Sequence, residues 1–174
     1  MVVRFQVPQE APNLNAVEIR PAKPGDEGRI FDLVAELAEF EKLRHLLVGS
    51  PEMLARDMFS ESPKVMSIVA VLDGNIIGYA LFFWTYSTFL TKPGLWMEDL
   101  YVTPEHRGNG IGQRLLNAVV DFAAQAGAGR LEWAVLDWNV NAIQFYEKLG
   151  ADIMPDWRIC RITDPGHPSS SSIK

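Results

Sequence analysis

The stretch Trp96-Met-Glu-Asp-Leu-Tyr-Val-Thr-Pro-Glu-His-Arg-Gly-Asn-Gly-Ile-Gly112 decides the fold. Apart from Glu98 and Asp99, the residues from Leu95 to Val102 are aromatic, apolar or β-branched, which predicts a strand. Three alternating glycines follow, at Gly108, Gly110 and Gly112. Apolar residues then recur at helical spacing from Ile111 to Ala126. The order strand, glycine loop, helix places bare backbone N–H groups at the positive end of a helix, and such an arrangement binds phosphate.

The totals are those of one ordinary globular domain. The chain has 174 residues, of which 48% are hydrophobic and 22% charged. Its net charge of −6 argues against nucleic acid as a partner and is compatible with a cationic substrate, although solubility alone explains it equally well. One cysteine excludes an intramolecular disulfide. No transmembrane-length apolar run and no signal-peptide pattern are present, so we expect a cytoplasmic protein without a membrane partner.

Hydrophobic periodicity predicts one domain over residues 16–162, between a flexible extension at 1–15 and a flexible, serine-rich tail at 163–174. The predicted strands are 16–20, 65–72, 75–85, 94–102, 130–136 and 157–162. The predicted helices are 26–42, 51–58, 111–126 and 139–149. Hairpin strands come before a strand–helix–strand segment. The fold class is therefore α/β (α+β), with a mixed, largely antiparallel central sheet and helices on both faces.

The glycine loop, which we define as Arg107 to Gly112, fits neither common nucleotide-binding fingerprint. The dinucleotide motif needs G-x-G-x-x-G, and the Walker loop needs Gly-Lys-Ser/Thr where this chain has Gly112 followed by Gln113. The pattern Arg107-x-x-Gly-x-Gly instead resembles the pyrophosphate loop of the GNAT superfamily of acetyl-CoA-dependent N-acetyltransferases. The alternative is a glycine-rich turn with a surface arginine.

Further passages resemble the diamine (spermidine/spermine) N-acetyltransferase branch of that superfamily, including its thialysine-acetylating relatives. They are Ile19-Arg-Pro-Ala22, Glu36-Leu-Ala-Glu-Phe-Glu41, Gly78 to Tyr86, Met97 to Val102, Asp137-Trp-Asn139 and Asn141-Ala-Ile-Gln-Phe-Tyr-Glu-Lys-Leu-Gly-Ala151. The resemblance implies a GNAT-like acyl-CoA N-acyltransferase fold. It also implies transfer of acetyl from acetyl-CoA to a primary amine of a small cationic substrate, a diamine, polyamine or thialysine-like amino acid, by direct attack in a ternary complex. A homodimer is implied as well.

Amine acetylation requires two proton transfers. An alkylammonium must lose a proton before it attacks a thioester, and an acid near the sulfur eases departure of the thiolate. Glu98 lies at the C-terminal part of the strand that enters the glycine loop, and by the resemblance it is the base, acting through water. Tyr146 is the acid. The alternatives are a solvated strand-end carboxylate for Glu98 and core packing beside Phe145 for Tyr146.

The resemblance also implies the residues that hold acetyl-CoA. The backbone of the strand end pairs with the pantetheine arm, the glycine loop holds the pyrophosphate, and residues near the last helix line the remaining groove. These residues are Leu100, Tyr101, Val102, Arg107, Gly108, Asn109, Gly110, Ile111, Gly112, Gln113, Asn139, Asn141 and Lys148. Asn139 is equally well explained as a helix N-cap, and Lys148 as a charge near a helix C-terminus.

The acceptor amine is expected among acidic and aromatic side chains. The positions matching the family are Phe40, Glu41, Glu98, Glu132, Trp133 and Ala134, and Glu36 and Asp99 add two more acids. Phe40 stands where the family has a tyrosine, and Asp156 is the nearest counterpart of the acid at the far end of the polyamine site. These differences favour smaller amines over long polyamines. No histidine pattern indicates a metal site.

Two other functions remain open from the sequence. The same fold could serve as a catalytically silent acyl-CoA-binding module, or it could acetylate an amine of a protein or peptide. The presence of both Glu98 and Tyr146 favours the enzyme.

Overall fold

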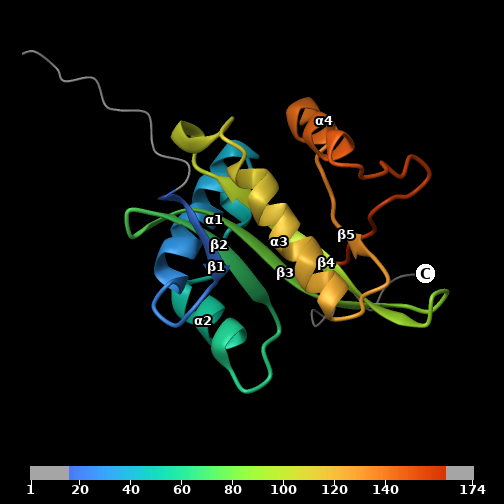
Figure 1. The fold of residues 1–174 in the computed structure, drawn as a ribbon, viewed down its shortest axis with the longest axis horizontal. Coiled ribbons are helices and arrows are strands. Elements are labelled where there is room, and N and C mark those ends of the chain that lie inside the picture. The colour runs from blue at the N-terminus through green and yellow to red at the C-terminus, as the bar shows by residue number, and fades with distance from the viewer. Residues whose placement is uncertain (1–15, 164–174) are drawn as a thin grey trace, which may run out of the picture. The chain divides into compact units, whose positions relative to one another are not determined.

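The computed structural model describes residues 16–163 (Figure 1). The predicted extension at 1–15 and all but the first residue of the predicted tail lie outside this range. The chain divides into two compact units, of which the first ends at Ala134 and the second begins at Val135.

The first unit contains the sheet. Its strands are β1 (Glu18–Pro21), β2 (Met66–Leu72), β3 (Asn75–Ser87), β4 (Lys92–Val102) and β5 (Leu131–Glu132). Its α-helices are α1 (Glu27–Phe40), α2 (Pro51–Phe59) and α3 (Ile111–Gln125), with short 3-10 helices η2 (Arg44–Leu46) and η3 (Pro104–His106). The strands lie in the order β1-β2-β3-β4-β5 and pair antiparallel, except that β4 and β5 are parallel. The predicted mixed, largely antiparallel sheet is therefore confirmed.

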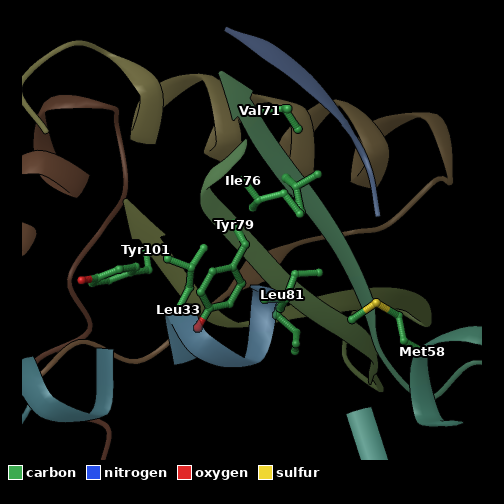
Figure 2. Packing of buried hydrophobic residues seen from close by; sticks show 9 residues of the cluster. Leu33, Met58, Val71, Ile76, Tyr79, Leu81 and Tyr101 are labelled. Atoms are coloured by element: carbon green, nitrogen blue, oxygen red, sulfur yellow. The ribbon is translucent and has the colours of Figure 1, made fainter. Parts of the chain in front are cut away.

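Helices cover both faces of this sheet. Residues of α1 and α2 share one buried cluster with side chains from β2, β3 and β4, including Tyr79 and Tyr101. Figure 2 shows Tyr79 between Leu33 and Leu81 in that cluster. On the opposite face, Phe122 of α3 packs against Phe82, with ring centroids 5.3 Å apart. The core thus fixes β3 and β4 between two helical layers.

Local signals mark the element boundaries as predicted. Ser50 caps α2 by accepting a hydrogen bond from the Met53 N–H. Asp73 and Gly74 connect β2 to β3 with φ values of 50° and 80°. Both are left-handed, as the tight hairpin turn between two twisted strands requires.

A β-bulge interrupts β4 where it pairs with β3. Leu81 lies opposite Asp99 and Phe82 lies opposite Met97, so Glu98 is the extra residue of β4. A bulge bends its strand and re-aims the neighbouring side chains.

The second unit contains α4 (Val140–Lys148). The side chain of Asn139 caps this helix by accepting a hydrogen bond from the Ala142 N–H at 3.2 Å. Gly150 follows the helix with φ 87°, as the predicted stop requires.

Two predicted strands differ from the structure. The strand predicted at 130–136 is reduced to Leu131–Glu132, and the residues at 157–162 are not a strand in the described chain. The residues at 157–162 are exposed and have no ladder partner among the described strands. A strand needs such a partner for its backbone polar groups, and alternation in the sequence does not supply one.

Candidate active site

Glu98 lies at the bulge of β4 with its side chain exposed. The indole Nε1–H of Trp96 donates a hydrogen bond to Glu98 Oε2 at 2.8 Å. That contact orients the carboxylate, and its exposure leaves it accessible to water and to a ligand. This geometry fits a base that acts through water.

Asp99, the next residue, is partly buried on the face that α1 covers. The Tyr79 hydroxyl donates a hydrogen bond to Asp99 Oδ2 at 3.0 Å. Burial is the main cause that raises the pKa of Asp99 to about 6, and the negative charges of Glu98 and Glu41 add to the increase. The hydrogen bond from Tyr79 opposes it. Asp99 therefore ionises close to neutral pH.

Three carboxyl groups lie near enough to interact electrostatically, and we call Glu41, Glu98 and Asp99 the acid cluster. Glu41 is the C-cap residue of α1, and burial raises the pKa of its carboxyl. Of the described residues, no arginine, lysine or histidine forms an ion pair with any of the three. A positively charged ligand would relieve their mutual repulsion.

A cavity of about 240 Å³ opens beside the acid cluster, with Asp99 in its lining. Its walls are mostly apolar and come from α1, α2, β3, β4 and the segments that precede α2 and β2, for example Val34, Leu54 and Leu81. Asp57, the second acid in the lining, is already paired with Arg56 and Lys64, which lower its pKa to about 2. Asp99 is therefore the acid in this cavity that still lacks a cation.

The glycine loop leads into α3 with its backbone exposed. Gly108 and Gly110 have φ values of 77° and 76°, and nothing lies within 4 Å of where a Cβ would project from either. Gly110 is the N-cap of α3, and no side chain of the described part of the chain caps this helix. The first N–H groups of a helix have no acceptor within the helix, so this end of α3 is suited to an anion.

The strand before the loop has an open edge. Thr103 N–H donates to the Ile77 carbonyl of β3 at 2.9 Å. Because backbone groups alternate along an antiparallel strand, those of Leu100 and Val102 face away from β3. In the described sheet, β5 pairs with β4 only at Leu95 and Trp96. An extended ligand could therefore add to β4 as a further strand, along Leu100 and the N–H of Val102.

Arg107, at the start of the loop, makes its contacts outside the loop. Its Nε donates to the Val102 carbonyl at 2.7 Å. Its Cζ lies 5.2 Å from the ring centroid of Phe40 and 5.0 Å from that of Tyr101. The guanidinium thus contacts α1 and β4.

The first unit also contains the rest of the predicted acceptor and loop residues. Glu132 forms an ion pair with Arg130 at 2.7 Å, and Trp133 and Ala134 follow β5. Glu36 is already engaged by Arg29 and by the Tyr101 hydroxyl. Ile111 is buried, so only its backbone is available to a ligand. Asn109 donates to the His106 carbonyl, and Gln113 lies in the first turn of α3.

The second unit contains the remaining predicted residues, Asn139, Asn141, Tyr146 and Lys148. Tyr146 lies on α4 and is buried, with its ring 5.2 Å from that of Phe145. Lys148 is the last residue of α4, and Asn139 is its cap. Core packing of Tyr146 and capping by Asn139 are thus both observed, and neither prevents a further role.

Sequence reasoning missed Tyr79, the partner of Asp99. Tyr79 reads as one more buried residue of an apolar strand. One signal could have identified it: Tyr79 is a tyrosine among small and aliphatic residues of a buried strand. A buried hydroxyl needs a hydrogen-bond partner.

The model of the Acetyltransferase (GNAT) family matches residues 32–151. The chain belongs to the GNAT family. It is therefore an acetyl-transferring enzyme, and the resemblance noted in the sequence is confirmed.

Several proteins are similar to this GNAT chain over most of their length. Bovine thialysine N-epsilon-acetyltransferase is 41% identical over 78% of this chain and 84% of its own. L-ornithine N5-acetyltransferase NATA1 of Arabidopsis thaliana is 32% identical over 90% of each chain. An integron cassette protein from the mobile metagenome of V. cholerae superposes with a TM-score of 0.74 at 24% identity, covering 90% of this chain and 98% of that one, which supports the fold alone.

Two further observations describe the GNAT chain. No helix of residues 16–163 is both long and apolar enough to cross a bilayer. In the same range, no three His, Cys, Asp or Glu side chains are grouped so that they could hold a metal ion.

Proposed function

We propose that this protein transfers the acetyl group of acetyl-CoA to a primary amine of a small substrate that carries a second positive charge, by direct attack in a ternary complex. Diamines and basic amino acids of the ornithine and thialysine type have this character. The observation that carries the proposal is the position of the acid cluster at the bulge of the strand whose open edge leads into the glycine loop.

The donor side fits acetyl-CoA. The open backbone groups of Leu100 and the N–H of Val102 would pair with the pantetheine arm, because the Val102 carbonyl already accepts from Arg107. The N–H groups from Gly108 to Gln113 would hold the diphosphate. In the second unit, Asn139, Asn141 and Lys148 would line the remaining groove. Acetyl-CoA, when bound, supplies an acetyl group activated as a thioester.

The acceptor side fits a dication. The reacting nitrogen must lose its charge before it attacks, so it cannot neutralise the acid cluster during the reaction. A second ammonium keeps its charge, and Asp99 offers it a carboxylate without a cation, beside an apolar cavity that suits a short alkyl chain. The names of the thialysine and ornithine acetyltransferase relatives support the same substrate class.

Two side chains would move the protons. Glu98, reached through water, would take the proton that the substrate ammonium loses. The amine nitrogen would then form a bond to the acetyl carbon as the carbon–sulfur bond breaks. Tyr146 would give a proton to the departing sulfur, and the second proton that the nitrogen loses as the amide forms would replace it through water. A homodimer remains a prediction from the family resemblance, and a cytoplasmic location remains a prediction from the composition of the sequence.

The test is thiol release from acetyl-CoA with a panel of amines: ornithine, thialysine, lysine, cadaverine, spermidine and an N-terminal peptide. Pentylamine is the matched control because it equals cadaverine in length and lacks its second charge. We expect cadaverine to have the higher kcat/KM by roughly tenfold, the value of one charge-assisted contact. Equal kcat/KM values for cadaverine and pentylamine would contradict the assignment of the acceptor site. Turnover of the peptide alone would mean that the substrate is a protein amine.

A further inference from the structure

Arg107 makes three contacts, all with residues outside the glycine loop. Nε donates to the Val102 carbonyl at 2.7 Å, and the guanidinium carbon lies 5.2 Å and 5.0 Å from the ring centroids of Phe40 and Tyr101. None of the ion pairs among the described residues includes Arg107. Two aromatic rings and one carbonyl therefore stabilise its charge.

These contacts belong to a larger network that reaches back into α1. The Tyr101 hydroxyl donates to Glu36 at 3.2 Å, and Glu36 also accepts from Arg29 at 3.1 Å. Arg29 in turn donates to the Ile76 carbonyl. The ring that supports Arg107 from β4 is thus itself fixed by the helix that supplies Phe40.

The glycine loop has little else to hold it. No atom of the described residues lies within 4 Å of the Cβ positions of Gly108 and Gly110, so nothing there packs against that side of either glycine. Among residues 16–163, the side chain of Asn109 donates to the His106 carbonyl, three residues earlier in the chain. Glycine loses more backbone freedom on ordering than any other residue, so a loop of this composition binds a ligand well only if its ends are anchored.

We propose that Arg107 is a positioning residue that anchors the glycine loop to Phe40 at the end of α1, and we call this set of contacts the Arg107 clasp. The affinity for acetyl-CoA therefore depends on the Phe40 ring. The Arg107 clasp consists of Arg107, Phe40, Tyr101 and the Val102 carbonyl. It couples the two halves of the proposed site, since Phe40 precedes Glu41 of the acid cluster and Arg107 precedes the first glycine of the loop. The inference rests on the proposed binding of acetyl-CoA to that loop.

The experiment is a double-mutant cycle with Phe40→Leu and Arg107→Lys, in which acetyl-CoA affinity is measured by calorimetry. Phe40 is 42% exposed, so its replacement should leave the fold intact, and thermal unfolding checks this. Lysine keeps the charge and loses the planar group that stacks on both rings. We expect each single change to weaken acetyl-CoA binding roughly fivefold and the double change to weaken it little further, because both remove one interaction.

Three controls separate the clasp from general damage. Phe40→Tyr keeps an aromatic face and should restore wild-type affinity. Phe89→Leu removes a ring that is 97% exposed in the β3–β4 hairpin, and Arg44→Lys changes an exposed arginine, so neither should alter affinity. Amide hydrogen exchange at Gly108 and Gly110, measured without ligand, should accelerate in Phe40→Leu and not in Phe89→Leu.

The outcomes distinguish the inference from the proposed function. If the wild type binds acetyl-CoA and the two changes add, or Phe40→Leu binds normally, the clasp is overturned and the proposed function stands. If the wild type does not bind acetyl-CoA, the proposed function is overturned. In that case, the hydrogen exchange measured without ligand still tests the clasp. If the Gly108 and Gly110 amides exchange equally fast in Phe40→Leu and in the wild type, the clasp is overturned as well. If they exchange faster in Phe40→Leu, the anchoring of the loop is upheld.

Discussion

The hydroxyl of Tyr79 in β3 donates a hydrogen bond to the carboxylate of Asp99 in β4, with 3.0 Å between the two oxygens. This contact joins residues twenty positions apart across neighbouring strands. It leaves Asp99 with a neutral partner in an acidic surrounding, next to an apolar cavity. The relationship makes Asp99 the centre of the proposed acceptor site.

Replacing Asp99 by asparagine should raise the KM for a diamine by roughly tenfold or more, since a hydrogen bond to a charged group contributes about 1.5–3 kcal/mol. The KM for acetyl-CoA should change little. Asp57→Asn is the matched control because Asp57 lines the same cavity but is already paired with Arg56 and Lys64. Steady-state kinetics with each substrate varied would show the difference, and equal effects of the two substitutions would argue against a role of Asp99 in binding.

The pH dependence follows from the pKa of Asp99, which is raised from its ordinary value of 3.8 to about 6. Below that pH the carboxyl is protonated and attracts an ammonium less, so affinity for the diamine should increase as the pH rises through about 6. Tyr79→Phe removes the hydrogen bond that lowers this pKa and should shift the midpoint to higher pH. A kcat/KM profile of the two proteins tests this, and a shift to lower pH would contradict it.

The raised pKa of Asp99 also predicts how the free energy of unfolding changes with pH. The folded state binds the Asp99 proton more tightly than the unfolded state, so the contribution of this group to stability is present at low pH and is lost as the pH rises from about 4 to above 6. In Asp99→Asn that loss should be absent. Chemical unfolding at several pH values, compared with the wild type, would reveal it, and parallel curves for the two proteins would contradict it.

Gly110→Ala should weaken acetyl-CoA binding and lower the free energy of unfolding by about 1 kcal/mol. The cause is backbone conformation, since φ is 76° and the added methyl group would meet no atom within 4 Å. Gly74→Ala is a close match, with φ 80° and equally open surroundings in the β2–β3 turn. It should lose similar stability and bind acetyl-CoA normally. Titration calorimetry with acetyl-CoA tests this for both variants. If Gly110→Ala and Gly74→Ala bind acetyl-CoA equally well, Gly110 is not part of the cofactor site.

Tyr146→Phe should lower kcat by about 10²- to 10⁴-fold, the usual contribution of a positioned acid, while acetyl-CoA affinity stays near the wild-type value. The ring and its contact with Phe145 are retained in this variant, so the helix should remain intact. Kinetics and calorimetry on the same preparation separate the two effects. Loss of affinity without loss of kcat would mean that Tyr146 only packs in the cofactor groove.

Much of the chain could be predicted because its signals are local. Ser50 lies beside the helix it caps, Asp73-Gly74 makes a turn from its own two φ angles, and Gly150 ends α4 directly behind it. The glycine loop belongs to the same class, since strand, glycines and helix follow one another without interruption. In each case the determining interactions span a few residues, so the order of the amino acids alone contains them.

Contacts between distant residues were decided by the tertiary structure. The bulge at Glu98 depends on the register of β3 against β4, the Tyr79–Asp99 bond joins facing strands, and Arg107 reaches a helix that ends at Phe40. The residues at 157–162 alternate like a strand and remain outside the described sheet. Strand pairing, side-chain direction at a bulge and the partner of a buried charge all depend on which other segment lies alongside, and a local pattern does not specify that neighbour.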